Sequence, residues 1–295
     1  MSPICQTNTK FIMKNLEEKY TWEKENVDEI PPIGFFHVLK GLLRLLVFLP
    51  LTIFLVVIFL IFKAILKPLN LNYPVFLIRK SWSILILRLF GLKLKVIGKQ
   101  SYNSTIFVSN HISWTDILVI QSVLDIIFVA KSDVKKMPGL GFLASIANTI
   151  FIDRNPQKIS KDSFILRKKI EKGELICFFP EGTSTDGLRV LKFKPGFFQL
   201  LFDNIYNKDT HIKKVQPLSI YYKVYNKNLS KDFYGWWGSM GIIQHITKIL
   251  CLSSGSVELK FHDPLSSEEF NDRKEIALTA ENTIANYISF QLSNN

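Results

Sequence analysis

An uncharged apolar run near the N-terminus constrains this chain more than any other feature of its sequence. Leu45 to Phe62 is an 18-residue stretch without a charged side chain, and basic residues bracket it on both sides. A helix of this length extends about 27 Å, close to the hydrocarbon thickness of a bilayer. The run begins too far into the chain, behind a long polar segment, for an ordinary signal peptide. It predicts a membrane helix, with a buried core helix as the alternative.

A second apolar segment, Tyr73 to Leu92, is interrupted by Arg79, Lys80 and Arg88. Each of these charges would cost about 2.5–3.5 kcal/mol near the bilayer centre, so a second full span is not expected. The pattern favours an amphipathic helix in the interface, with its basic face toward anionic lipid. The chain therefore either crosses the membrane once or dips in and returns as a re-entrant pair.

The composition fits a protein at a membrane surface. Of the 295 residues, 47 % are hydrophobic and 21 % are charged, and the net charge is +12. This balance excludes a disordered chain, and the spread of the basic residues argues against a nucleic-acid binder. Three cysteines without close spacing favour reduced thiols, and together with the strongly basic downstream region they favour the bulk of the chain on the cytoplasmic face of the membrane. The histidines and cysteines are too scattered to build a zinc site, so no metal is expected.

From about Lys93 the sequence alternates between short β-branched runs and helical patterns. This alternation predicts an α/β domain with a mixed, largely parallel sheet flanked by helices, behind the N-terminal apolar membrane-anchoring helical segment. We divide the chain into a polar segment at 1–40, membrane-anchoring helices at 41–92 and this domain at 93–295. Pro138-Gly139-Leu140-Gly141 is interpreted as a loop. The predicted strands are Leu94–Ile97, Ser104–Ser109, Thr149–Asp153, Glu174–Phe179, Val215–Tyr221 and Ser256–Phe261, and the predicted helices are Asp116–Leu124, Lys161–Lys172, Phe193–Asn204 and Ser267–Gln291.

A histidine and a carboxylate follow one of these strands. His111 and Asp116 come directly after Thr105–Ser109, where α/β sheets place reactive groups. In a continuous helix, positions five apart diverge by about 140°, so pairing requires His111 in a turn and Asp116 in the first helical turn. The Nδ1–H can then reach the carboxylate, and the other ring nitrogen can take a proton. A structural histidine near a helix N-terminus is the alternative.

No nucleophile of the protein accompanies this pair. The sequence has no serine or cysteine in an elbow such as G-x-S-x-G. A His–Asp dyad without its own nucleophile indicates that a hydroxyl of the substrate attacks.

Two further strands end in polar clusters. After Pro180 come Glu181, Gly182 and Thr183, where the glycine lets the backbone approach a ligand and the hydroxyl can donate; a simple turn with a solvated glutamate is the alternative. The strand through Ile152 ends at Arg154, whose planar guanidinium suits phosphate or carboxylate; a surface salt bridge is the alternative.

Taken together, these clusters resemble the glycerolipid acyltransferase family, which includes 1-acylglycerol-3-phosphate acyltransferases. The resemblance covers about Leu94 to Leu265, and its four blocks occur in the family's order. The blocks are Asn110-His111 with Asp116, Phe151-Ile-Asp-Arg154, Phe179-Pro-Glu-Gly-Thr183 and Val215-Gln-Pro217-Leu-Ser-Ile220, and Val129-Ala-Lys131 and Pro138-Gly-Leu-Gly141 resemble the intervening segment.

The resemblance implies a membrane-bound O-acyltransferase that moves a fatty acyl group from acyl-CoA or acyl carrier protein to a lysolipid, without a cofactor. It implies His111 as general base and Asp116 as its orienter. The acceptor it implies is 1-acylglycerol 3-phosphate, giving phosphatidate in phospholipid biosynthesis. It also implies a set of substrate-binding residues, with Arg154 on the acceptor head group and Lys131 on the oxyanion or the donor's phosphates; the set is Lys131, Arg154, Glu181, Gly182 and Thr183.

One departure from the family pattern concerns the acceptor. Many members have arginine directly after Glu-Gly-Thr, where this chain has Ser184 followed by Thr-Asp-Gly; Arg189 or Lys194 could replace it. This variant, with the aromatic run at 233–237, is similar to a branch that includes lyso-ornithine lipid acyltransferases, so lyso-ornithine lipid is the alternative acceptor. A non-enzymatic lipid-binding membrane adaptor on the same fold is the other alternative, and it would not need His111 beside Asp116.

Overall fold

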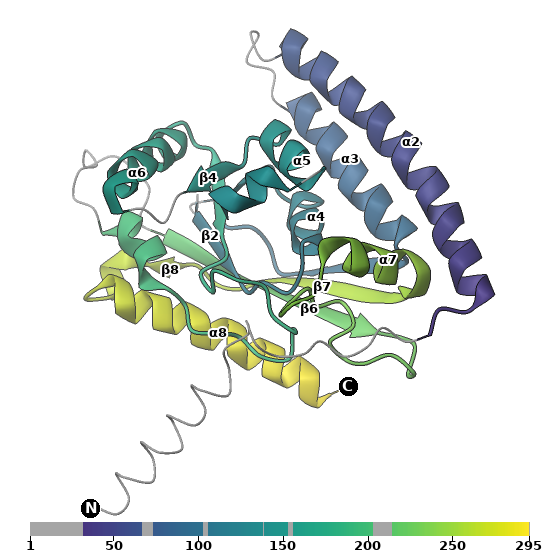
Figure 1. The fold of residues 1–295 in the computed structure, drawn as a ribbon. Coiled ribbons are helices and arrows are strands. Elements are labelled where there is room, and N and C mark those ends of the chain that lie inside the picture. Colours follow the sequence, from purple (N-terminus) through teal and green to yellow (C-terminus); the bar gives the residue numbers. More distant parts are fainter. Residues whose placement is uncertain are drawn as a thin grey trace, which may run out of the picture.

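The computed structural model describes residues 32–66, 73–102, 106–137, 139–152, 156–202 and 214–294. A mixed sheet lies between helices on both faces, and two N-terminal helices run side by side along one flank (Figure 1). The helices are α2 (Phe35–Leu66), α3 (Tyr73–Leu89), α4 (Thr115–Gln121), α5 (Leu140–Ile146), α6 (Pro156–Glu171), α7 (Ile242–Leu252) and α8 (Arg273–Ser293), with 3₁₀ helices η2 (Ser132–Lys136), η3 (Pro195–Leu201) and η4 (Ser267–Glu269). The strands are β1 (Leu92–Ile97), β2 (Ile106–Ser109), β3 (Ile126–Lys131), β4 (Ile150–Ile152), β5 (Leu175–Phe178), β6 (Lys214–Val224), β7 (Gly255–Phe261) and β8 (Leu265–Ser266).

The sheet is largely parallel, as predicted. Within the described residues its order is β1-β7-β6-β2-β5-β3-β4, with β8 beside β6. The strands from β6 to β4 pair in parallel, as do β1 and β7, whereas β6 pairs antiparallel with β7 and β8. Because β2, β3, β4, β5 and β6 run in one direction, their carboxyl ends meet at one edge of the sheet, where open α/β folds bind ligands.

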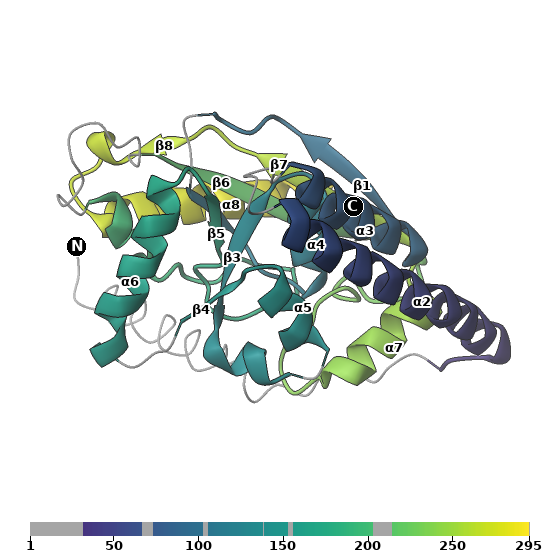
Figure 2. The same cartoon turned by 90° about the horizontal axis from the view of Figure 1, so that it is seen from above.

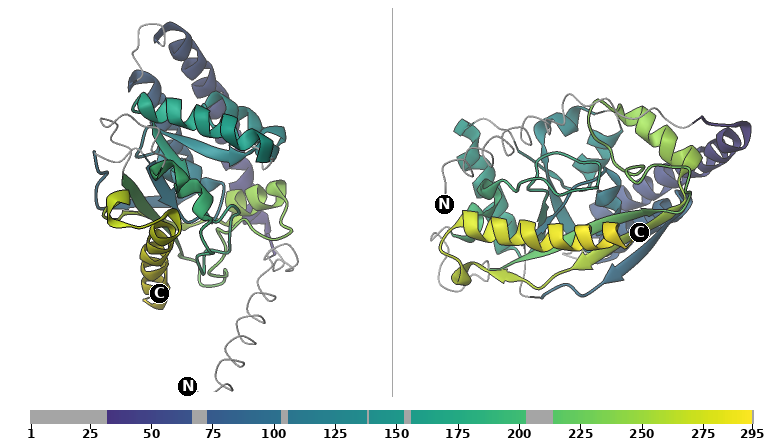
Figure 3. Two further views of the ribbon diagram at one scale, coloured as in Figure 1. Left: turned by 90° about the vertical axis from the view of Figure 1, so that its left-hand side faces the viewer. Right: turned by 90° about the horizontal axis from the view of Figure 1, so that it is seen from below.

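Successive side chains of the central strands enter two separate cores. On β2, Phe107 packs in the core that includes α3, α4 and α7, whereas Ile106 and Val108 pack in the core that includes α6, η3 and α8. Figure 2 looks onto the first group of helices, and the right-hand view of Figure 3 shows α8 lying across the opposite face. Both faces of the parallel strands are therefore covered, which explains their continuous apolar sequence.

Most predicted elements are confirmed, and some differ. The six predicted strands correspond to β1, β2, β4, β5, β6 and β7, and two predicted helices to α4 and α6; β3, α5 and α7 were not predicted. The loop interpretation at 138–141 was wrong from Leu140 onward, because Gly139 takes a φ of 72° and α5 begins directly after it. Of the predicted helix at 193–204, the structure shows the 3₁₀ helix η3 instead of an α-helix. α8 begins later than predicted because Asp272 caps it at Arg273.

The apolar run lies inside α2, which confirms the predicted helix. α2 begins at Phe35, before the predicted boundary at 41, and continues through Pro50. Its mean hydropathy reaches 3.2 over 18 residues, and among the described residues it is the one helix long and apolar enough to cross a membrane.

α3 is the helix predicted for the second apolar segment, but it does not lie exposed along its length. It packs against α2 on one side and against α4 and β1 on the other, and Ile86 and Leu87 are buried. Trp82 Nε1 donates to Thr52 Oγ1 of α2 at 3.1 Å. The prediction that the basic side chains face lipid is wrong for Arg79, because this side chain forms an ion pair with Asp125 of the α/β domain.

Both ends of α2 are bonded to the α/β domain. Near its start, Gly41 is buried against Cys251 of α7, and Arg44 Nη1 donates to the carbonyls of Leu250 at 2.9 Å and Ser253 at 3.3 Å. Arg44 therefore caps the C-terminus of α7, where a cation is favoured by the helix dipole. At the other end, Lys63 Nζ donates to the carbonyl of Ile146 at 2.8 Å. The helix consequently lies along the domain.

We predict that Gly41→Ala destabilises the protein, because the new Cβ would lie 2.5 Å from Cys251 Sγ. Overpacking of this kind costs about 1–3 kcal/mol. In a Cys251→Ala background the nearest remaining atoms are at 3.5 and 3.6 Å, so the same change should be neutral or stabilising, since alanine is the better helix residue. Thermal unfolding in detergent micelles measures both effects. Gly34→Ala is the control, because its Cβ would meet only His37 Nδ1, at 3.8 Å. A Gly41→Ala loss of the same size in both backgrounds would contradict the prediction.

Candidate active site

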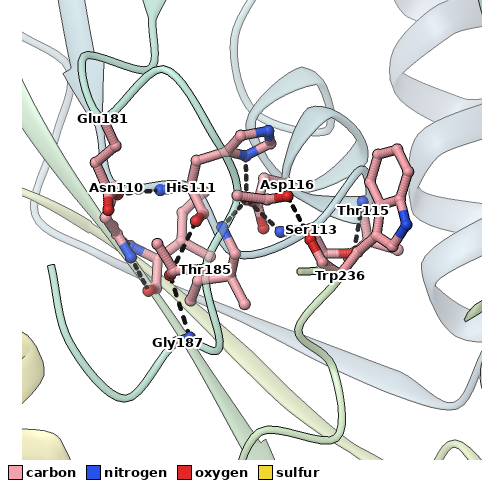
Figure 4. A network of polar contacts seen from close by, with 12 residues as sticks. Asn110, His111, Ser113, Thr115, Asp116, Glu181, Thr185, Gly187 and Trp236 are labelled. Carbon is pink, nitrogen blue, oxygen red and sulfur yellow. Dashed lines mark hydrogen bonds and ion pairs between the residues drawn. The ribbon is translucent and has the colours of Figure 1, made fainter. Parts of the chain in front are cut away.

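The predicted catalytic turn lies at the sheet edge formed by the carboxyl ends of the parallel strands. The turn at 110–114 follows β2, the loop at 179–194 follows β5, and β6 runs beside β2. Val108 near the end of β2 pairs with Phe178 at the end of β5 and with Pro217 of β6. The turn after β2 and the loop after β5 therefore leave the sheet side by side, next to β6. Figure 4 shows how their polar side chains converge on the turn.

His111 and Asp116 are paired as the sequence predicted. His111 lies in the turn after β2 and Asp116 in the first turn of α4, and the distance from His111 Nδ1 to Asp116 Oδ2 is 2.8 Å. A proton on Nδ1 is required for this contact, so in the neutral ring Nε2 carries the lone pair. In the part of the chain that the structure describes, Nε2 has no hydrogen-bond partner, and the His111 side chain is 19 % exposed. This geometry suits a general base.

The Asp116 carboxylate is fully buried and accepts four hydrogen bonds, three from the turn after β2 and one from β6. Besides His111, Oδ2 accepts from the backbone N–H of Ile112 at 2.7 Å and of Ser113 at 2.9 Å. Oδ1 accepts from the hydroxyl of Tyr222 on β6 at 2.9 Å. Burying a carboxylate is costly unless its oxygens are satisfied in this way. The contacts therefore fix both the carboxylate and the imidazole that it orients.

The loop after β5 holds the main chain of His111 from both sides. The N–H of His111 donates to Glu181 Oε1 at 2.7 Å. The carbonyl of His111 accepts from the N–H of Thr185 at 2.9 Å and from the Thr185 hydroxyl at 3.1 Å (Figure 4). The second oxygen of Glu181 accepts from the N–H of Leu191 at 2.8 Å. The third sequence block, through Glu181, is thus bonded to the backbone of His111 in the first block.

Glu181 sits in a strongly desolvated position. Its side chain is buried, and this burial raises the pKa of the carboxyl to about 8, although the two backbone donors work in the opposite direction. The carboxyl group consequently binds a proton near neutral pH far more readily than in water.

An aromatic ring covers one face of the imidazole. The Phe179 ring stacks on His111 with centroids 4.1 Å apart and planes 20° apart, and Phe128 of β3 stacks on Phe179 at 6.2 Å. These contacts restrict rotation of the imidazole about its side-chain bonds, so the ring is held by packing as well as by Asp116.

The remaining predicted site residues have different settings. Lys131 ends β3, on the sheet edge that also carries His111. Gly182 has a φ of 72°, and a Cβ there would lie 2.4 Å from Lys194 Nζ, so this ammonium occupies the space beside the glycine. The hydroxyl of Thr183 is on the exposed side of the loop. Arg154 lies outside the described residues. Their roles in substrate binding stay predictions.

Some residues that shape the site were not identified from the sequence. Tyr222 and Thr185 contact the pair or its backbone from 106 and 74 positions away along the chain. The role of Asn110 was also missed, although it belongs to the first block. Its amide donates to the carbonyl of Ile220 at 2.9 Å and accepts from the N–H of Ile220 at 2.8 Å, which ties the turn to β6. The sequence signal for this contact was the presence of both the first block, which contains Asn110, and the fourth block, which contains Ile220.

Ser184 is bonded to the aromatic segment at 233–237. Its hydroxyl donates to the carbonyl of Trp236, and the N–H of Trp236 donates to the carbonyl of Ile112 in the catalytic turn at 2.9 Å. The residue that replaces the family's arginine thus links the loop after β5 to this segment.

A cavity of about 300 Å³ adjoins the turn at the end of β6. Two residues of its wall also belong to the site. Ile112 lies in the catalytic turn, and the Tyr222 hydroxyl donates to Asp116. Three lysines, Lys223, Lys227 and Lys231, also line it. Asp186 lines it as well, so the cavity wall carries charges of both signs, with lysines in excess.

The fold and the site together define a class of protein: an α/β protein that holds a histidine, bonded to a buried aspartate, beyond the carboxyl end of a central strand. Comparisons with known proteins agree with this class. A family model described as Acyltransferase matches residues 93–219.

Relatives extend the match beyond that segment. A lyso-ornithine lipid O-acyltransferase from Rhodobacter capsulatus is 34 % identical over 65 % of this chain and 69 % of its own length. A 1-acyl-sn-glycerol-3-phosphate acyltransferase from Neisseria gonorrhoeae is 26 % identical over 66 % of this chain and 73 % of its own length. The crystal structure of the 1-acyl-sn-glycerophosphate acyltransferase from Thermotoga maritima has the same fold, with a TM-score of 0.62 at 20 % identity over 88 % of this chain and 98 % of that one. The chain belongs to this acyltransferase family and is an acyltransferase, which confirms the resemblance drawn from the four blocks.

We predict that Glu181 makes the protein less stable as the pH rises. The pKa of its carboxyl is about 8 in the fold against an ordinary 4.5, so between these values the folded state holds a proton that the unfolded state has lost. The free energy of unfolding then falls from about pH 5 to about pH 8. Thermal unfolding across this range should show a shallower decline in Glu181→Gln, which cannot titrate. Glu269→Gln, at an exposed position, is the control and should follow the wild type; equal slopes in all three proteins would contradict the prediction.

Proposed function

We propose that this enzyme transfers a fatty acyl group from a thioester, on coenzyme A or acyl carrier protein, to the free hydroxyl of a membrane lysolipid. The observation that carries the proposal is the 2.8 Å contact between His111 Nδ1 and Asp116 Oδ2, which leaves the lone pair of Nε2 available to accept a proton. A lipid-binding adaptor has no need of this arrangement.

In the proposed reaction His111 is the general base and Asp116 its orienter. The lysolipid hydroxyl gives its proton to Nε2 while its oxygen attacks the thioester carbonyl carbon. The C–S bond of the tetrahedral intermediate then breaks, and Nε2 returns the proton to the leaving sulfur. An ester and a free thiol result, and every proton is accounted for. Asp116 stabilises the imidazolium that exists between the two proton transfers.

For the acceptor, we favour lyso-ornithine lipid. The relative that acts on this lipid is 34 % identical to the chain, against 26 % for the Neisseria relative named for 1-acylglycerol 3-phosphate. The position after Glu-Gly-Thr supports the same acceptor, because Ser184 donates to Trp236 and offers no cation to a phosphate.

1-Acylglycerol 3-phosphate, the acceptor predicted first from the sequence, is the second candidate. The observation in its favour is the Lys194 ammonium, which sits beside Gly182 in the loop that would contact the acceptor. Arg154 and Lys131 would add further cations, as the family resemblance implies.

We propose that α2 and α3 enter the membrane as a re-entrant pair, with the catalytic domain on the cytoplasmic face. α2 exposes apolar side chains along its length, such as Leu46 and Ile53, which are 71 % and 64 % exposed. A helix bonded at both ends to one domain cannot cross the bilayer and leave that domain on one side. The free thiols of Cys177 and Cys251 support a reducing compartment.

The proposed reaction is tested by assaying membranes that contain the wild type, His111→Ala or Asp116→Asn. Each is offered lyso-ornithine lipid or 1-acylglycerol 3-phosphate, with acyl-CoA or acyl carrier protein as donor. Loss of the base or of its orienting charge should lower kcat by about 100-fold or more. Unchanged turnover in His111→Ala would exclude this base, and a wild type that acylates neither lipid would exclude the proposed function.

The acceptor preference is tested by Ser184→Arg. A guanidinium at this position favours a phosphate over the ornithine head group, so the kcat/KM ratio of 1-acylglycerol 3-phosphate to lyso-ornithine lipid should rise about tenfold. Ser184→Ala is the matched control, because it removes the same hydrogen bond to Trp236 without adding a charge. A ratio that changes equally in both variants would show that charge at this position does not select the acceptor.

A further inference from the structure

A buried histidine on α7 contacts the catalytic turn through Trp114. His245 of α7 is fully buried, and its Nδ1 accepts from the indole N–H of Trp114 at 2.9 Å. An indole nitrogen can only donate, so the ring proton of a neutral His245 is on Nε2, which donates to the carbonyl of Tyr234 at 3.2 Å. Burial, together with the charge of Lys248, lowers the pKa of His245 to about 3. Both ring nitrogens are therefore committed, in opposite roles, in a neutral imidazole.

Trp114 belongs to the turn that orients the base. It lies between Ser113, whose N–H donates to Asp116 Oδ2, and Thr115, whose hydroxyl contacts the Tyr222 hydroxyl at 2.7 Å. The Trp114 indole also packs edge-on against Phe90, with ring centroids 5.9 Å apart. The orientation of the turn is thus fixed by how the indole is held between α3's C-terminal end and α7.

His245 also reaches the segment that holds the turn from its other side. Tyr234, whose carbonyl accepts from His245, is two residues from Trp236, whose N–H donates to the carbonyl of Ile112. One imidazole therefore connects the indole of the turn with the segment bonded to the turn's backbone.

We propose that His245 is a positioning residue for acyl transfer, acting through Trp114 on the His111–Asp116 pair. This inference rests on the proposed function. Without the acceptor at Nδ1 the partly buried indole would lose the partner of its N–H, and the turn would shift to satisfy it. A displacement of the base by a fraction of an ångström lowers the rate of the chemical step rather than substrate affinity.

Two substitutions separate the two nitrogens of His245. Asn places its Oδ1 near the position of Nδ1 and can still accept from Trp114, whereas Gln places its amide nitrogen near Nε2 and can still donate to Tyr234. We expect His245→Gln to lower kcat by about 10- to 100-fold with KM within about twofold of the wild type, and His245→Asn to stay within about threefold of the wild type. The measurement is steady-state kinetics of the full-length protein in detergent micelles with lyso-ornithine lipid and acyl-CoA.

Trp114→Phe tests the same link without altering His245. It removes the N–H and should lower kcat as His245→Gln does, and the double variant should be no slower than either single variant, because both remove one interaction. Thr247→Ala on α7 is the control; its side chain is exposed and bonds only to the carbonyl of Ile243, so kcat should not change.

A spectroscopic reading separates this inference from the proposed function. The far-downfield proton signal of the His111 Nδ1–H bonded to Asp116 should persist in His245→Asn and weaken in His245→Gln and Trp114→Phe. Equal kinetic losses for the Asn and Gln variants, additive losses in the double variant, or an unchanged proton signal would each overturn the inference. A wild type with no transferase activity would refute the proposed function, and the proton signal would still decide whether His245 positions the turn.

Discussion

The buried carboxylate of Asp116 is the interaction on which the site depends. A charge removed from water must be satisfied by the protein, and here the donors are the His111 ring and two backbone N–H groups of the turn after β2, together with Tyr222 on β6. Each of these elements has to lie where it does for the carboxylate to be tolerated at all. The same contacts leave the imidazole with one bonded nitrogen and one available nitrogen. The cost of burying Asp116 is thus offset by contacts that also orient the His111 imidazole.

The parallel sheet explains why the site could be predicted from the sequence. Polar residues that follow buried strands in a parallel sheet share one edge, so clusters far apart in the chain can meet there. His111 and the loop with Glu181 do meet, because β2 and β5 are neighbours. The β-branched runs identified six strands since buried strands must be apolar throughout.

What the sequence did not reveal depends on long-range contacts and on local competition. Tyr222, Thr185 and His245 act over separations of 106, 74 and 131 residues, and nothing in their local sequence distinguishes them from core residues. α5 was missed because the glycines at its start are typical of a loop. The positive φ of Gly139 is nevertheless compatible with a helix that begins at the next residue. The basic residues of α3 suggested lipid contact because the sequence does not show that Asp125 lies beside Arg79.

α7 joins the membrane-facing part of the molecule to the catalytic turn. Its C-terminal carbonyls are capped by Arg44 of α2, while His245, two turns earlier on the same helix, holds the indole of Trp114. In the proposed reaction the nucleophile is a lipid hydroxyl, so His111, the proposed base, has to lie at a fixed height relative to the bilayer that holds the acceptor. α7 is bonded to α2 at its C-terminal end and contacts the turn through its buried His245, so it provides that fixed distance. The tight Gly41–Cys251 contact is consistent with this requirement, because it lets α2 approach α7 more closely than any larger side chain would allow.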